Sequence, residues 1–230
     1  GDWSSLRALT QAHPNQVAYT VGLHPTEVKE NYASELKALE KSLEETSSPA
    51  CGIGEFGLDF FRLEERPNAQ SQVQWQRKAF LAQISIAKAA NLPVVIHSRG
   101  AGAYKEILDT LDAAKVDWTK FVFHCFSEGP AEIRELNARG ARASFTGIIT
   151  FKNGQLMREA LLAQPAQLLM FETDAPFLAP EPHRGKRNDP SLIPLIAAKA
   201  AELYGIPLSK LATDSYAETV KFFGLKAWAK

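Results

Sequence analysis

The stretch Pro93-Val94-Val95-Ile96-His97 shows the pattern that decides the fold class. It is an apolar run short enough to be one buried strand, and it ends directly at a histidine. Five similar runs occur along the chain, each rich in β-branched or aromatic residues. They span residues 17–23, 50–56, 121–123, 143–149 and 168–171. Longer segments with helical spacing separate these runs. The alternation predicts βαβ units and an α/β fold whose parallel strands are covered by helices.

The helical segments repeat apolar residues at intervals of three and four positions. Two further segments of this kind, through residues 192–203 and 211–223, follow the last predicted strand. The clearest earlier ones carry Leu36, Leu39 and Leu43, then Phe80, Ile84 and Ala87, then Tyr104, Ile107, Leu108 and Leu111. No internal repeat, low-complexity tract or linker interrupts them. The sequence therefore predicts one domain over residues 1–230.

Composition narrows the class of protein. The 230 residues include 26 Lys and Arg against 26 Asp and Glu, so a generally basic nucleic-acid coat and an acidic disordered tail are excluded. No apolar stretch approaches the roughly 18 residues of a membrane span, and the first residues do not resemble a secretory signal. Cys51 and Cys125 are far apart and form no Cys-x-x-Cys spacing. We expect reduced thiols, no membrane attachment and a cytoplasmic location.

Metal-ligating side chains stand where the predicted strands end. In a (β/α) barrel the carboxyl ends of all strands open onto one rim, so residues far apart in sequence become neighbours there. Imidazole and carboxylate together suit zinc, manganese or iron, and magnesium where water completes the shell. The predicted metal ligands are Glu55, His97, His124 and Asp174.

Each of these residues alone also has an ordinary structural interpretation. A single histidine at a strand end is more often a hydrogen-bonded edge residue, Asp174 can cap a following helix, and Glu55 can pair with an arginine. Two histidines and two carboxylates at equivalent places favour the metal. His24, followed by Pro25, is either part of a structural turn or a substrate contact. Cys125 follows a predicted ligand, and strand alternation predicts that it points away from the rim.

A basic loop follows Asp174. Its sequence, Pro-His-Arg-Gly-Lys-Arg-Asn at 182–188, indicates either a solvated surface loop or an anion clamp, since arginine offers a planar fork to phosphate. Its position beside a predicted ligand favours the clamp. The predicted anion-binding residues are Arg184, Lys186 and Arg187, with Arg99 and Arg62 extending the same positive rim.

Six segments occur in one order over nearly the whole chain. They are Gly-Leu-His-Pro (22–25), Gly-Ile-Gly-Glu-Phe-Gly-Leu-Asp-Phe (52–60), Pro-Val-Val-Ile-His-Ser-Arg (93–99), Phe-His-Cys-Phe-Ser (123–127), Glu-Thr-Asp-Ala-Pro (172–176) and Arg-Gly-Lys-Arg-Asn (184–188). Together they resemble the motifs of the TatD family of metal-dependent deoxyribonucleases. The resemblance implies a TIM-type (β/α)8 barrel and one or two divalent ions, Mg, Mn or Zn, at the four predicted ligands. It also implies that Asp59 supports the Glu55 loop rather than binding metal.

One departure from the family pattern concerns the start of the chain. Many members begin with a strand ending in His-x-His, which this sequence lacks. The run at 17–23 matches what is normally the third strand, so strand 1, helix 1 and strand 2 are predicted to be missing. Six strands do not close an eight-stranded barrel, and open edges would favour a homo-oligomer.

The resemblance implies metal-assisted hydrolysis of phosphodiesters, typically exonucleolytic trimming of DNA, with RNA or tRNA as other possible substrates. Asp174 would take a proton from the attacking water or hold a second ion. The predicted substrate-binding residues are His24, Arg99, Arg184, Lys186 and Arg187. Two alternatives stay open: an ester or amide hydrolase such as a D-aminoacyl-tRNA deacylase, and a truncated, catalytically weak binding or structural remnant.

Overall fold

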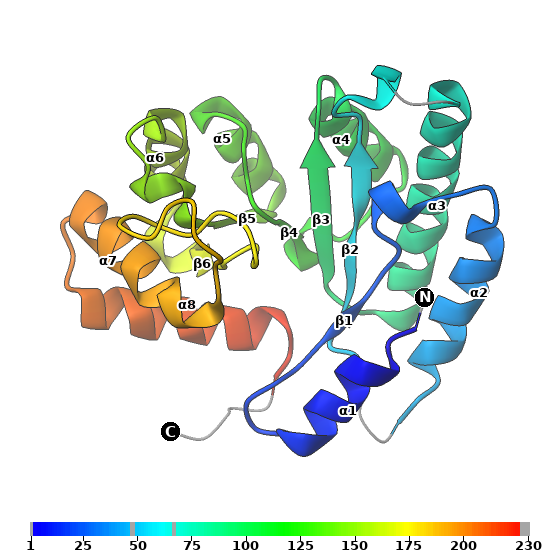
Figure 1. The fold of residues 1–230 in the computed structure, drawn as a ribbon, viewed down its shortest axis with the longest axis horizontal. Coiled ribbons are helices and arrows are strands. Elements are labelled where there is room, and N and C mark those ends of the chain that lie inside the picture. Colours follow the sequence, from blue (N-terminus) through cyan, green and yellow to red (C-terminus); the bar gives the residue numbers. More distant parts are fainter. Residues whose placement is uncertain (1, 47–48, 66–67, 226–230) are drawn as a thin grey trace. The chain divides into compact units, whose positions relative to one another are not determined.

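The structure, a computed structural model, describes residues 2–46, 49–65 and 68–225 (Figure 1). The chain divides into two compact units. The first combines the described residues of 1–121 with those from 223 onward, and the second is residues 122–222. That the whole chain is one domain stays a prediction.

The first unit contains three parallel strands in the order β1 (Thr20–Val21), β2 (Gly52–Asp59) and β3 (Val94–Arg99). The pairing of β2 with β3 brings Gly57 opposite His97 and Asp59 opposite Arg99. Helices α3 and α4 pack against these strands (Figure 1). The helical elements are α1 (Ser4–Ala12), η1 (Pro25–Glu27), α2 (Tyr32–Leu43), η2 (Leu63–Glu65), α3 (Ala69–Ala90), α4 (Ala103–Ala113) and η3 (Trp118–Lys120).

Strands β2 and β3 lie in the core of the first unit. Phe56 of β2 and Ile96 of β3 are fully buried, and the Phe56 ring lies 5.7 Å from the Phe80 ring of α3, centroid to centroid. At Gly57 an added Cβ would lie 1.8 Å from the carbonyl oxygen of His97. Only glycine therefore allows β2 to approach β3 this closely beside His97.

The second unit also has parallel strands, β4 (Phe121–Phe123, whose first residue belongs to the first unit), β5 (Arg142–Phe145) and β6 (Met170–Phe171). Its short strands are largely buried, as the apolar runs predicted. Around them lie α5 (Pro130–Arg139), η4 (Gly147–Thr150), α6 (Gln155–Ala163), η5 (Ala166–Leu168), η6 (Pro190–Leu192), α7 (Ile193–Tyr204) and α8 (Leu208–Phe222).

Helix α7 carries a run of small buried residues, among them Ala197, Ala200 and Ala201. No single helix in the described ranges is both long and apolar enough for a membrane span. Residues 190–204 and 208–222 meet the criteria of length and composition only when taken together, across a bend of 113°.

The predicted α/β class with parallel strands is confirmed, but the strand ends differ. The run predicted at 143–149 leaves the strand at Phe145, because the side chain of Thr146 caps η4 and starts a 3-10 turn. Strands β2 and β3 instead extend beyond their predicted ends, since they pair with each other up to Asp59 and Arg99. Glu55 and His97 consequently lie within strands rather than after them.

Candidate metal centre

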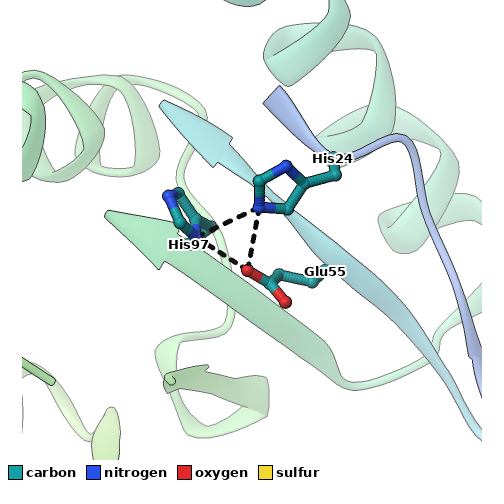
Figure 2. A group of neighbouring side chains, drawn as sticks. All are labelled: His24, Glu55 and His97. Atoms are coloured by element: carbon teal, nitrogen blue, oxygen red, sulfur yellow. Dashed lines mark hydrogen bonds and ion pairs between the residues drawn. The ribbon is translucent and has the colours of Figure 1, made fainter. Parts of the chain in front are cut away.

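Three side chains of the first unit lie close together: His24, Glu55 and His97 (Figure 2). Oε1 of Glu55 lies 2.7 Å from Nδ1 of His97 and 3.1 Å from Nε2 of His24, and the two ring nitrogens are 3.3 Å apart. One donor atom from each residue lies within 4.8 Å of the others. We call these three residues the first-unit donor group.

The other ring nitrogen of His97 meets a second carboxylate, because Nε2 lies 3.2 Å from Oδ2 of Asp59. A neutral imidazole has one N–H and can donate to only one of two carboxylates. If both carboxylates are ionised, the two contacts of His97 need either a doubly protonated ring or a cation in place of the second proton. A donor set of two imidazoles and a carboxylate fits a divalent transition metal, with Asp59 fixing the N–H on the far side of the ring.

Asp59 is suited to this supporting role. Its side chain is buried, and Oδ1 accepts a hydrogen bond of 2.9 Å from the Phe61 amide. Burial raises the pKa of Asp59, but the hydrogen bonds from His97 and the Phe61 amide outweigh it and hold that pKa below its usual value. The ionised carboxylate of Asp59 thus orients His97. The family resemblance had implied a different role for Asp59, support of the Glu55 loop.

His24 has two local roles. It caps η1, where Nδ1 lies 2.7 Å from Oγ1 of Thr26 and 3.2 Å from the Thr26 amide nitrogen. As a cap, Nδ1 accepts the Thr26 N–H, so a neutral ring in this role carries its proton on Nε2, which faces Glu55. Binding a metal through Nε2 would require the proton on Nδ1 instead, where the Thr26 hydroxyl can accept it. From the sequence, His24 was predicted to be either part of a structural turn or a substrate contact. Its place in the first-unit donor group makes it a candidate metal ligand as well.

In the second unit, the carboxylate of Glu172 takes the corresponding role for His124. Its Oε2 lies 3.2 Å from Nδ1 of His124, and Oε1 accepts hydrogen bonds from the Cys125 amide, at 2.6 Å, and from the Ser144 hydroxyl. Burial raises the pKa of Glu172, but the hydrogen bond and charge of His124 and the bonds from Ser144 and Cys125 outweigh it, so that pKa lies below its usual value. An anionic Glu172 favours the tautomer of His124 that carries its proton on Nδ1 and its lone pair on Nε2.

Two residues beside this site adopt left-handed backbone conformations that are uncommon for side-chain-bearing residues. Asp174 has φ of 53° and Cys125 has φ of 44°. Sγ of Cys125 lies 4.0 Å from Oδ2 of Asp174, so the prediction that Cys125 points away from the site was wrong. Strand β4 ends at Phe123, and strand alternation does not extend to Cys125. Such conformations concentrate at functional sites.

The predicted basic loop is exposed on the second unit. Arg184, Lys186 and Arg187 are solvent-exposed, and the guanidinium carbon of Arg184 lies 4.1 Å from the centre of the Phe151 ring. The next residue, Asn188, is buried and donates to the carbonyl of Thr173 at 2.8 Å. Asn188 therefore ties the basic loop to the segment that carries Asp174.

The structure brings Glu55 and His97 together in the first unit, with His24 beside them and exposed Arg99 at the end of β3. In the second unit, Glu172 contacts both His124 and Cys125, and Cys125 in turn approaches Asp174. Sequence reasoning missed the role of Glu172, although it stands two residues before Asp174 in a quoted motif.

The fold and the carboxylate-held histidines define a metal-dependent hydrolase of the α/β class. The chain belongs to the family of TatD-related DNases, whose model matches residues 1–224. It is 34% identical over 206 residues to the uncharacterized metal-dependent hydrolase YcfH of Escherichia coli K12, covering 88% of this chain and 73% of YcfH. It is 33% identical to the 3'-5' ssDNA/RNA exonuclease TatD of Erwinia amylovora, over 95% of this chain and 82% of that protein.

A solved structure supports the same assignment of the fold. The crystal structure of YjjV, a TatD homologue from Escherichia coli K12, superposes with a TM-score of 0.85 at 25% sequence identity. The match covers 97% of this chain and 83% of YjjV. The predicted TIM-type α/β class and the predicted family are thereby confirmed.

Proposed function

We propose that this metal-dependent hydrolase cleaves phosphodiester bonds of DNA as an exonuclease. The observation that carries the proposal is His97, held between the carboxylates of Glu55 and Asp59 with His24 beside it, an arrangement that a bound divalent cation would satisfy. The similarity to a relative named as a 3'-5' exonuclease of single-stranded DNA and RNA supports this substrate class.

The proposed metal ligands are Glu55, His97, His124 and Asp174, for one or two ions. His24 adds a further donor beside Glu55. Because imidazole nitrogens dominate the first-unit donor group, manganese or zinc fits it better than magnesium, which prefers oxygen ligands and water. The carboxylate of Glu55 has two oxygens and can serve two ions.

A bound divalent ion would polarise a phosphoryl oxygen and lower the pKa of a coordinated water. Asp174 would accept the proton of the attacking water as general base, a role that typically contributes about 10²–10⁴-fold to the rate. Arg184, Lys186 and Arg187 would hold the phosphate by charge-assisted hydrogen bonds. With a net charge of zero, attraction would rest on this local basic loop.

The first test combines metal analysis with a nuclease assay. We expect bound divalent ion in the wild-type protein, loss of that ion in the His97→Ala/His124→Ala double variant, and hydrolysis of single-stranded DNA when manganese or magnesium is added. Asp174→Asn should lower kcat on DNA about 10²–10⁴-fold while the circular dichroism spectrum stays unchanged. Asp214→Asn, at a carboxylate that pairs with Lys210 on α8, is the matched control and should retain activity.

Three results would contradict the proposal. Wild-type turnover in Asp174→Asn would remove Asp174 from the reaction. A wild-type protein that takes up no ion from excess manganese or excess zinc would exclude the metal centre. Hydrolysis of an aminoacyl ester without any hydrolysis of DNA or RNA would move the activity to another bond class.

A further inference from the structure

Phe61 is an exposed aromatic residue that stands close to the first-unit donor group. Its side chain is 43% exposed although the ring is large and apolar. The guanidinium carbon of Arg99 lies 4.2 Å from the ring centre and that of Arg62 lies 5.3 Å from it. The exposed aromatic ring therefore lies next to two positive charges, and neither arginine belongs to the first-unit donor group.

The position of Phe61 is fixed relative to His97. The Phe61 amide donates to Oδ1 of Asp59, whose other oxygen faces His97, so one carboxylate links the two residues. The Phe60 amide donates to the carbonyl of Arg99 at 2.8 Å. At Gly100 an added Cβ would lie 2.5 Å from the Phe61 nitrogen, so the end of β3 packs directly on this backbone.

A surface hollow of about 450 Å³ adjoins the Phe61 ring. Its size falls in the range of small-molecule sites, roughly 300–1,000 Å³. Apolar side chains line much of it, with a guanidinium among them; the lining includes Phe60, Phe61, Arg62, Leu63, Gln70 and Val73. Such a surface suits a flat apolar group attached to an anion.

We propose that Phe61 is the stacking platform for a nucleobase of the substrate, with Arg62 and Arg99 binding the adjoining phosphates. The inference rests on the proposed function and names the feature of the nucleic acid that this rim recognises. Bases stack on aromatic rings and guanidinium planes without regard to sequence, and phosphates pair with arginine. Because only an unpaired base exposes a free face, the platform selects single-stranded ends.

The test compares two oligonucleotides of equal length, an oligothymidylate and the same sugar-phosphate chain without bases. Binding is measured by fluorescence anisotropy and hydrolysis by product analysis. We expect Phe61→Ala to raise Kd and KM for oligothymidylate about tenfold, because one aromatic contact typically contributes that much per base. Phe61→Trp should retain tight binding. With the base-free chain, Phe61→Ala and the wild type should give equal Kd.

Arg99→Ala separates the phosphate contact from the base contact. It should weaken both oligonucleotides by the same factor and reduce the slope of log K against log salt by about one. Leu81→Ala is the matched control, because Leu81 is 51% exposed on α3 of the same unit, and it should change neither substrate.

Two outcomes would overturn the platform. Equal weakening of both oligonucleotides by Phe61→Ala would give Phe61 a merely structural role, and no weakening of either would remove it from binding. A wild-type protein that binds oligothymidylate but hydrolyses neither chain contradicts the proposed function alone. In that case the anisotropy comparison still decides the role of Phe61.

Discussion

His97 in the first unit and His124 in the second each contact a supporting carboxylate, but through different ring nitrogens. Asp59 contacts Nε2 of His97, so Nδ1 faces the first-unit donor group, whereas Glu172 contacts Nδ1 of His124, so a neutral His124 carries its lone pair on Nε2. In both, a carboxylate fixes the tautomer, and this orientation is typical of histidines that bind metal. The comparison shows that the direction of the lone pair follows from the partner carboxylate and not from the strand alone.

The two units differ in what surrounds each histidine. His97 has two further donors, His24 and Glu55, within 4.8 Å in its own unit. Among the described residues of the second unit, no comparable group of three appears, and Asp174 is connected to His124 through Cys125 and Glu172.

Conversion of each supporting carboxylate to its amide should have the largest effect on metal binding. In Asp59→Asn, the amide oxygen would stay on the Phe61 N–H, so the new NH₂ would face Nε2 of His97 and move the ring proton to Nδ1. In Glu172→Gln, the oxygen would stay on the Cys125 amide and the NH₂ would face His124 in the same way. Both exchanges should lower metal affinity about 10–100-fold, measured by calorimetry, and Asp59→Asn the more strongly.

Asp109→Asn is the matched control for this exchange. Its carboxylate is 63% exposed and pairs with Lys105 on α4, so its removal should leave metal affinity unchanged. Wild-type affinity in both Asp59→Asn and Glu172→Gln would contradict tautomer control by these carboxylates.

A smaller effect should appear in the pH dependence of stability. The pKa values of Asp59 and Glu172 are both lowered in the folded protein, so each carboxylate stabilises the fold above its unfolded pKa. That contribution is lost as the pH falls through the folded values. We expect the free energy of unfolding in metal-free buffer to decrease below about pH 4–5, the range where unfolded carboxyls begin to protonate. Urea titrations at a series of pH values measure it.

The amide variants sharpen this result. Asp59→Asn and Glu172→Gln should each show a shallower acid-side decrease than the wild type, because one titrating group is gone. An unchanged slope in both would mean that other carboxyl groups control acid unfolding.

Much of the first-unit site follows from the sequence, because β2 and β3 are neighbouring parallel strands and Gly57 of one lies opposite His97 of the other. The apolar runs around Glu55 and His97 are therefore enough to bring them together. His24 lies in a loop, and its entry into the donor group depends on a contact with Thr26 that no periodicity shows. For Glu172, the deciding feature is a side-chain orientation toward His124, which its motif does not specify.

The thiol of Cys51 should react slowly in the folded protein. Cys51 lies before β2, and its thiol donates to the carbonyl of Tyr19 at 3.2 Å. Burial raises the pKa of Cys51 to about 11, so the thiolate fraction at about pH 8 is on the order of 100-fold below that of a free cysteine. Alkylation of a Cys125→Ser variant, which carries only Cys51, should be slower than that of free cysteine by a similar factor and should accelerate in urea. Alkylation of the folded variant at the rate of free cysteine would contradict the burial of this thiol.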